Sequence, residues 1–213
     1  MTPEEYNKGK LESGDIGPEH ISILSAFWQQ NHDLEADGMC GAKTITSLLE
    51  SLPKSESTIG ALALEIAIGE IGNGEVGGNN SGPHIAKYKG IKDDGDDDDD
   101  GAWCASFVSW CCLEAAKRLE IDLPFKTSHG AKRLLRNVIK SGGGRISDPK
   151  PGDIVCWDRG RPGSWQGHIG FVENLKNGIL YTVEGNVGRF PSRVRKFQHD
   201  FDRETRLEGF ARL

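Results

Sequence analysis

Residues 151–186, PGDIVCWDRGRPGSWQGHIGFVENLKNGILYTVEGN, decide the fold class. Three segments in this stretch, 151–157, 167–175 and 178–186, are apolar or alternate between apolar and polar residues, and Gly, Pro, Asn and Asp separate them. This pattern predicts successive β-strands. SRVRKFQ (192–198) and LEGFARL (207–213) continue the series to the end of the chain.

The residues before this stretch have a helical period instead. Apolar residues recur at helical spacing, and Gly or Pro interrupts the pattern between one segment and the next. Helices are expected over residues 18–32, 42–51, 58–71, 103–119 and 129–140. Because the helices come first and the strands second, the sequence predicts an α+β protein.

A short polar segment divides the chain. LPKSES, at 52–57, has the composition of an interdomain linker, and 213 residues are enough for one medium domain and a small appendage. We therefore expect a small all-α domain at 1–52, a linker at 53–57 and a main domain at 58–213.

Composition excludes several classes of protein. The net charge of −6 and the pI near 5.6 argue against nucleic acid as a partner, because phosphate binding needs clustered Lys and Arg. The longest apolar stretch, 59–68, is far shorter than the ~20 residues of a membrane-spanning helix. The opening residues, MTPEEYNKGK, do not look like a signal peptide, so synthesis in the cytoplasm without a signal peptide is expected.

Cys104 is the candidate nucleophile. Five cysteines without a CxxC pair fit neither a disulfide framework nor a zinc ribbon, so reduced thiols are expected. Cys104 falls in the first turn of the helix predicted at 103–119, where unpaired amides and the helix dipole favour a thiolate and its own backbone N–H could hold an oxyanion. Small buried apolar residues are the simpler interpretation of the other four, Cys40, Cys111, Cys112 and Cys156.

His168 is the candidate general base. It opens the strand 167–175 directly after a loop rich in Gly and Pro, and imidazole titrates near neutral pH. On the next strand Glu184 and Asn186 are two residues apart and are expected to share a face, so either could orient the imidazole. The remaining histidines considered, His20, His32, His129 and His199, are interpreted as surface residues.

GAWCASFVSWC (101–111), GHIGFVENL (167–175) and EGN (184–186) together resemble the CHAP superfamily of cysteine, histidine-dependent amidohydrolases and peptidases. The resemblance covers roughly residues 57–213 and implies a papain-like α+β fold. It implies that Cys104 is the nucleophile, His168 the base, Glu184 the orienting carboxylate and Asn186 a supporting amide. Trp103 precedes the cysteine where many members have glutamine.

The front unit resembles a second family. SAFWQQNHDLEADGMCGAKTITSLL (25–49) is similar to the small three-helix peptidoglycan-binding domain, through its aromatic and glutamine residues at 27–30, its DG pair at 37–38 and its G-x-x-T helix start at 41–44. A plain helical hairpin is the alternative.

An acidic run, DDGDDDDDG at 93–101, precedes the nucleophile. Some CHAP-like enzymes bind calcium in this loop, and closely spaced carboxylates supply the oxygen ligands that calcium requires, here with Asp97 and Asp99 as candidates. A solvated loop of like charges is the alternative. No other cofactor is expected.

These resemblances predict a peptidoglycan hydrolase that cuts an amide bond, either as an N-acetylmuramoyl-L-alanine amidase or as a stem-peptide endopeptidase. Trp103, Trp157 and Trp165 are expected to line its substrate groove. Two alternatives are a catalytically silent wall-binding protein and a transglutaminase-like acyl transferase.

Bacterial peptidoglycan is the expected partner. The protein is expected to be a monomer that does not insert into a membrane. The protein would reach the wall after release as a phage endolysin or after delivery as a secreted toxin. A toxin would also need an immunity protein as a partner.

Overall fold

The computed structural model describes residues 18–51, 58–92, 101–161 and 163–213. The chain divides into two compact units, residues 1–56 and 57–213. The division falls at the segment expected to be a linker. No helix in the described ranges combines the length and the apolar character needed to cross a bilayer.

In the first unit, helices α2 (Pro18–Gln30) and α3 (Ala42–Ser51) are joined through one buried side chain. The Gln29 amide donates hydrogen bonds to Asp37 Oδ1 at 2.8 Å and to Thr44 Oγ1 at 2.9 Å, and its oxygen accepts one from the Gly38 N–H at 2.9 Å. The residues that carry the resemblance to the wall-binding family thus hold the loop between the two helices. The described part of the unit is helical, as predicted.

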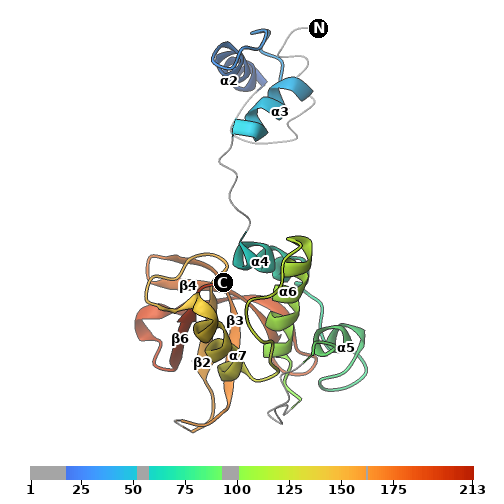
Figure 1. The fold of residues 1–213 in the computed structure, drawn as a ribbon, viewed down its shortest axis with the longest axis vertical. Coiled ribbons are helices and arrows are strands. Elements are labelled where there is room, and N and C mark those ends of the chain that lie inside the picture. The colour runs from blue at the N-terminus through green and yellow to red at the C-terminus, as the bar shows by residue number, and fades with distance from the viewer. Residues whose placement is uncertain (1–17, 52–57, 93–100, 162) are drawn as a thin grey trace. The chain divides into compact units, whose positions relative to one another are not determined.

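The second unit is a set of helices followed by an antiparallel sheet, as Figure 1 shows. This order confirms the α+β prediction. The sheet has the strand order β1-β6-β2-β3-β4-β5. Its elements are α4 (Ile59–Gly69), α5 (Pro83–Lys89), α6 (Cys104–Arg118), α7 (Ala131–Val138), η1 (Ile139–Gly143), β1 (Arg145–Ile146), β2 (Ile154–Asp158), β3 (Gly167–Lys176), β4 (Ile179–Val187), β5 (Arg193–Asp200), η2 (Phe201–Arg203) and β6 (Leu207–Ala211).

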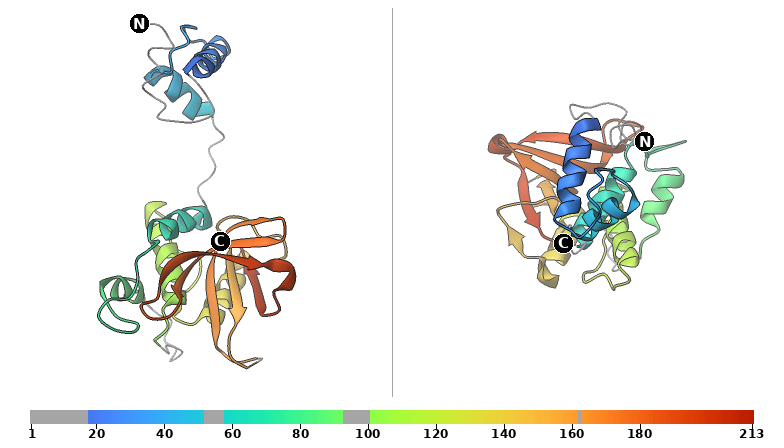
Figure 2. Two further views of the ribbon diagram at one scale, coloured as in Figure 1. Left: turned by 180° about the vertical axis from the view of Figure 1, so that it is seen from behind. Right: turned by 90° about the horizontal axis from the view of Figure 1, so that it is seen from above.

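Two hydrophobic clusters lie on the two faces of this sheet. The larger one is formed by helices α4, α6 and α7 against one face, and Figure 2 shows these helices beside the strands. The smaller one, on the other face, contains Val155, Trp157, Val172, Leu180 and Phe210. Alternating side chains therefore belong to different clusters, as expected for strands buried on both faces.

The start of α6 lies very close to β4. A Cβ atom on Gly185 would be 2.8 Å from ring atoms of both Trp103 and Phe107, so only glycine permits this approach. This contact sets the first turn of α6, which begins at Cys104, against the strand that carries Glu184.

Helix α5 was not predicted from the sequence. It has only seven residues and begins at Pro83, directly after Gly82, whose φ of 114° favours glycine. Glu75, in the segment that precedes this helix, is only 2% exposed. Its carboxylate accepts hydrogen bonds from the backbone N–H groups of Asn80 at 2.9 Å and Ser192 at 2.7 Å.

Candidate active site

Cys104 is the first residue of α6 and lies in a cleft of about 280 Å³. Cys104 is 4% exposed, and as the first residue of a helix it lies in the turn whose backbone N–H groups have no intrahelical partner. All five cysteines are free thiols, as predicted. The described residues that line the cleft are Ala102, Cys104, His129, Gly130, Ala131, Arg159, Gly160, Trp165, Gln166, Gly167 and Asn186.

His168 is held between two partners. Nε2 of the imidazole lies 2.7 Å from Glu184 Oε2. Nδ1 is buried and has no hydrogen bond of regular geometry with a described residue, while the thiol of Cys104 acts on the ring as a hydrogen-bonding and charged neighbour. Because Glu184 occupies Nε2, Nδ1 is the ring atom left for the sulfur. Hydrogen bonds of this kind are often long before substrate binds.

Glu184 is a buried carboxylate with three donors. Besides His168, it accepts hydrogen bonds from Thr182 Oγ1 at 2.5 Å and from His199 Nε2 at 2.7 Å. Burial alone would raise its pKa, but the hydrogen bonds from His168 and His199 lower the pKa of Glu184 to about 2. The carboxylate is therefore ionised at any pH at which the protein works and can hold the ring of His168 in one orientation.

Cys104 and His168 form a coupled acid–base pair. Burial alone would raise the pKa of Cys104, but the hydrogen bond and charge of His168, and then the charge of Arg159, outweigh burial and lower it. Burial opposes a charged imidazole, but Cys104 and Glu184 together raise the pKa of His168 to about 9. The lowered pKa of Cys104 and the raised pKa of His168 both favour the thiolate–imidazolium form of the pair, which is the reactive state of a cysteine nucleophile.

The sequence left Glu184 and Asn186 open as partners of His168, and the structure places their side chains in different surroundings. The ladder between β4 and β5 shifts register between Glu184 and Val187, and Asn186 takes a positive φ of 61°. Its side-chain oxygen accepts a hydrogen bond from Ser192 Oγ at 2.9 Å, and no described hydrogen bond joins it to His168. Glu184 is thus the residue that orients His168, while Asn186 lines the cleft beside Cys104.

Two of the three tryptophans predicted to line a groove do not do so. Trp103 is fully buried, and its indole N–H donates to Glu75 Oε1 at 3.3 Å. Trp157 is 6% exposed and packs on His168, with ring centroids 5.8 Å apart. These two predictions were wrong because position next to a catalytic residue in sequence does not fix side-chain direction. Trp165 is 46% exposed and lines the cleft, and its contact with substrate stays a prediction.

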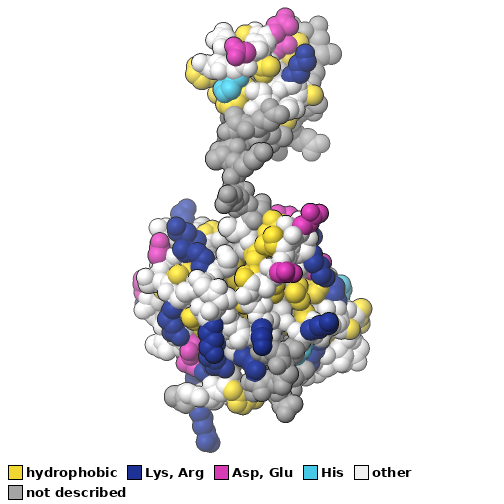
Figure 3. Space-filling view, in the orientation of Figure 1, with side chains coloured by type: hydrophobic (Ala, Val, Ile, Leu, Met, Phe, Trp, Pro, Cys, Tyr) yellow, Lys and Arg dark blue, Asp and Glu magenta, His cyan; other side chains and the backbone are white. Residues whose placement is uncertain are grey.

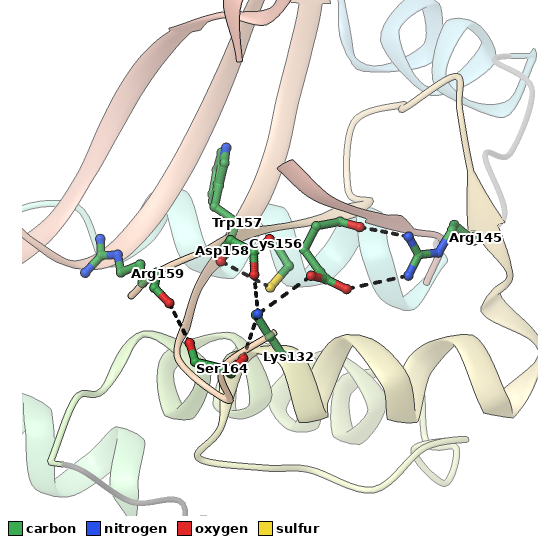
Figure 4. Close-up of polar contacts among 8 residues, drawn as sticks. Lys132, Arg145, Cys156, Trp157, Asp158, Arg159 and Ser164 are labelled. Carbon is green, nitrogen blue, oxygen red and sulfur yellow. Dashed lines mark hydrogen bonds and ion pairs between the residues drawn. The ribbon is translucent and has the colours of Figure 1, made fainter. Parts of the chain in front are cut away.

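Sequence reasoning missed two polar side chains that support the site. His199, interpreted as a surface residue, bonds Glu184 and lies over Trp157 with ring centroids 4.7 Å apart. Lys132 is buried, and its ammonium ion contacts Asp158 and donates to the carbonyl of Ser164 at 2.7 Å (Figure 4). The sequence did contain one signal for this contact. Lys132 lies among the apolar residues that α7 buries.

The candidate calcium ligands Asp97 and Asp99 lie outside the described residues. Within the described ranges, no three His, Cys, Asp or Glu side chains come together as a metal site. The calcium prediction is therefore untested.

Residues 96–186 match the family model of the CHAP domain, and the match includes Cys104, His168, Glu184 and Asn186. This part of the second unit is therefore similar to the CHAP domain. CHAP domains are typically cysteine- and histidine-dependent amidases or peptidases, and the family implies peptidoglycan hydrolysis in general. No curated protein and no solved structure matched the chain.

If the coupled pair catalyses hydrolysis, it predicts a bell-shaped pH profile for that activity. Activity should rise with pH as Cys104 ionises, below the ordinary range of a thiol because its pKa is lowered. It should fall as pH rises through about 9, because His168 then loses the proton that the leaving amine needs. The rate of iodoacetamide labelling of Cys104 should rise with pH as the thiol ionises but should not fall above pH 9, since alkylation needs no general acid. A hydrolysis rate that keeps rising beyond pH 10 would contradict this assignment.

Proposed function

We propose that this protein hydrolyses an amide bond of bacterial peptidoglycan, with Cys104 as nucleophile and His168 as general base and acid. The observation that carries the proposal is the Cys104–His168–Glu184 arrangement at an open cleft of a CHAP domain. A silent wall-binding protein would not require a thiol of lowered pKa beside a positively charged imidazole, so the hydrolase is favoured over that alternative.

The first half of the reaction forms an acyl enzyme. The Cys104 thiolate attacks the amide carbonyl carbon, and the backbone N–H of Cys104 at the start of α6 is placed to stabilise the oxyanion. When the carbon–nitrogen bond breaks, the His168 imidazolium gives its proton to the leaving amine. Cys104 is left as a thioester and His168 as a neutral imidazole.

The second half regenerates the enzyme. His168 removes a proton from water, and the resulting hydroxide attacks the thioester carbonyl. The carbon–sulfur bond breaks, the product leaves as a carboxylic acid, and thiolate and imidazolium are restored. Glu184 stays ionised throughout and stabilises the imidazolium through Nε2. Transfer of the acyl group to an amine in place of water would give the transglutaminase-like alternative.

Digestion of purified peptidoglycan tests the function directly. New termini identified by mass spectrometry should be a free amine and a free carboxylate at one amide bond, either between muramic acid and L-Ala or within the stem peptides. Parallel reactions with a calcium chelator and with added calcium test the expected metal in the run 93–100. A wall preparation that gains no new termini under any of these conditions refutes the hydrolase.

We also propose that the first unit binds the wall. Its support is the network around Gln29, which joins the residues of the peptidoglycan-binding motif, and an apolar groove between α2 and α3 that contains Leu24, Phe27, Trp28, Ile45 and Leu48. An aromatic and apolar groove can pack against sugar rings and short peptides. The wall would be reached after release as an endolysin or after delivery as a toxin.

Phe27→Ala should weaken sedimentation of the full chain with insoluble peptidoglycan. Phe27 is 66% exposed and lines the groove, so its removal should raise the dissociation constant about tenfold, on the order of 1–2 kcal/mol for one apolar contact. Ile23→Ala is the matched control, because Ile23 is 67% exposed on the same helix but does not line the groove. Equal losses in both variants, or none in either, would refute the groove as the binding surface.

A further inference from the structure

Arg159 has a fixed backbone and an exposed side chain at the edge of the cleft. It follows β2, its N–H donates to the Gln166 carbonyl at 3.1 Å, and its own carbonyl accepts from Ser164 Oγ at 2.9 Å. Lys132 anchors the same loop through the Ser164 carbonyl. The loop base is therefore held in place, while the guanidinium of Arg159 points away from this network, as Figure 4 shows.

The guanidinium of Arg159 has no counter-charge in the described part of the chain. Other cations near the cleft have acidic partners. The ammonium ion of Lys132 pairs with Asp158 and lies 3.8 Å from Glu208 Oε2. The guanidinium of Arg145 lies 3.8 Å from Glu208 Oε1. No comparable ion pair or side-chain hydrogen bond joins Arg159 to a described residue. Exposed Lys and Arg side chains also spread over one face of the second unit, which Figure 3 shows. The positive charge of Arg159 is thus available to a bound molecule.

The described cleft lining contains no carboxylate. Its members include Cys104, Arg159 and Gln166 but neither Asp nor Glu, and Glu184 is buried with His168 as its partner. The field of Arg159 reaches the reacting sulfur, since its charge is one cause of the lowered pKa of Cys104. A ligand group that contacts this guanidinium would therefore lie close to the scissile bond.

An arginine without an ion pair in a cleft is suited to a carboxylate, which it can bind through two parallel hydrogen bonds. We propose that Arg159 binds a free carboxylate of the stem peptide next to the scissile amide, so that the enzyme discriminates against peptides in which that carboxylate is amidated. This inference rests on the hydrolase function proposed above and names the class of its substrate, an anionic peptide.

Alkylation of Cys104 tests the anion site without any need for hydrolysis. Iodoacetate carries a carboxylate and iodoacetamide is its neutral analogue, so the ratio of their rate constants reports binding of the carboxylate and cancels changes in the thiolate fraction. Arg159→Gln should lower this ratio about tenfold, the scale of one charge-assisted hydrogen bond. Arg161→Gln is the matched control, because Arg161 is exposed on the same loop but does not line the cleft. An unchanged ratio in Arg159→Gln, or equal falls in both variants, overturns the proposal.

Hydrolysis of paired stem peptides tests the substrate class. Two peptides that differ only in a free or amidated carboxylate beside the scissile bond should be cleaved at different kcat/KM by the unmodified enzyme, with the free form preferred, and Arg159→Gln should abolish that preference. Equal cleavage of both peptides by the unmodified enzyme overturns the proposal. If neither peptide nor whole peptidoglycan is cut, the proposed function fails, and the alkylation ratio still decides whether the carboxylate site exists.

Discussion

Cys104→Ala should reduce peptidoglycan hydrolysis by at least about 10³-fold, because no other described group at the cleft can form the acyl intermediate. Folding should be little affected, since one sulfur atom is lost at a site that opens into a cleft. The release of new amine termini from purified walls measures the effect. Binding to the wall should persist, because the proposed wall-binding groove lies in the first unit.

Cys112→Ala is the control for this substitution. Cys112 lies on the same helix, is fully buried, and has a pKa raised by burial, so it cannot act as a nucleophile at neutral pH. Its removal should leave hydrolysis within a fewfold of the unmodified rate. If Cys104→Ala kept more than a tenth of the activity while folded, another residue would have to be the nucleophile.

The arrangement of the second unit was largely predictable from local signals. Gly, Pro, Asn and Asp separate the strands, and the change from helical to alternating period placed the boundary between the two layers. The position of Cys104 at the start of a helix and that of His168 at the start of a strand were predictable, because Gly and Pro mark both boundaries in the sequence. Each of these inferences needs only a few neighbouring residues.

The interpretations that failed depend on relations across the sheet. Glu184 and Asn186 were expected to lie on the same face of the strand. A register shift between Glu184 and Val187 interrupts that alternation, and it is visible only in the pairing of β4 with β5. His199 bonds Glu184 on the neighbouring strand, which depends on strand order and side-chain direction. Trp103 is buried against Gly185 of β4 and does not line the cleft. Such relations are set by packing rather than by local sequence.

Glu184→Gln should lower kcat/KM about 10²- to 10⁴-fold, because the imidazolium of His168 loses the charge that stabilises it and the acceptor that fixes its ring. The substitution keeps the volume of the side chain, so circular dichroism should show a folded protein. Without the carboxylate the pKa of His168 must fall, and the alkaline limb of the pH profile should move from about 9 to lower pH.

Glu173→Gln provides the matched control for this change. Glu173 lies on β3, its carboxylate pairs with Lys196 at the surface, and no described contact joins it to His168. The same loss of one negative charge should therefore leave both the rate and the alkaline limb unchanged. A merely structural role for Glu184 predicts a lower rate at every pH without movement of that limb. The shift of the limb thus separates a carboxylate that controls the charge of His168 from one that only holds β4 in place.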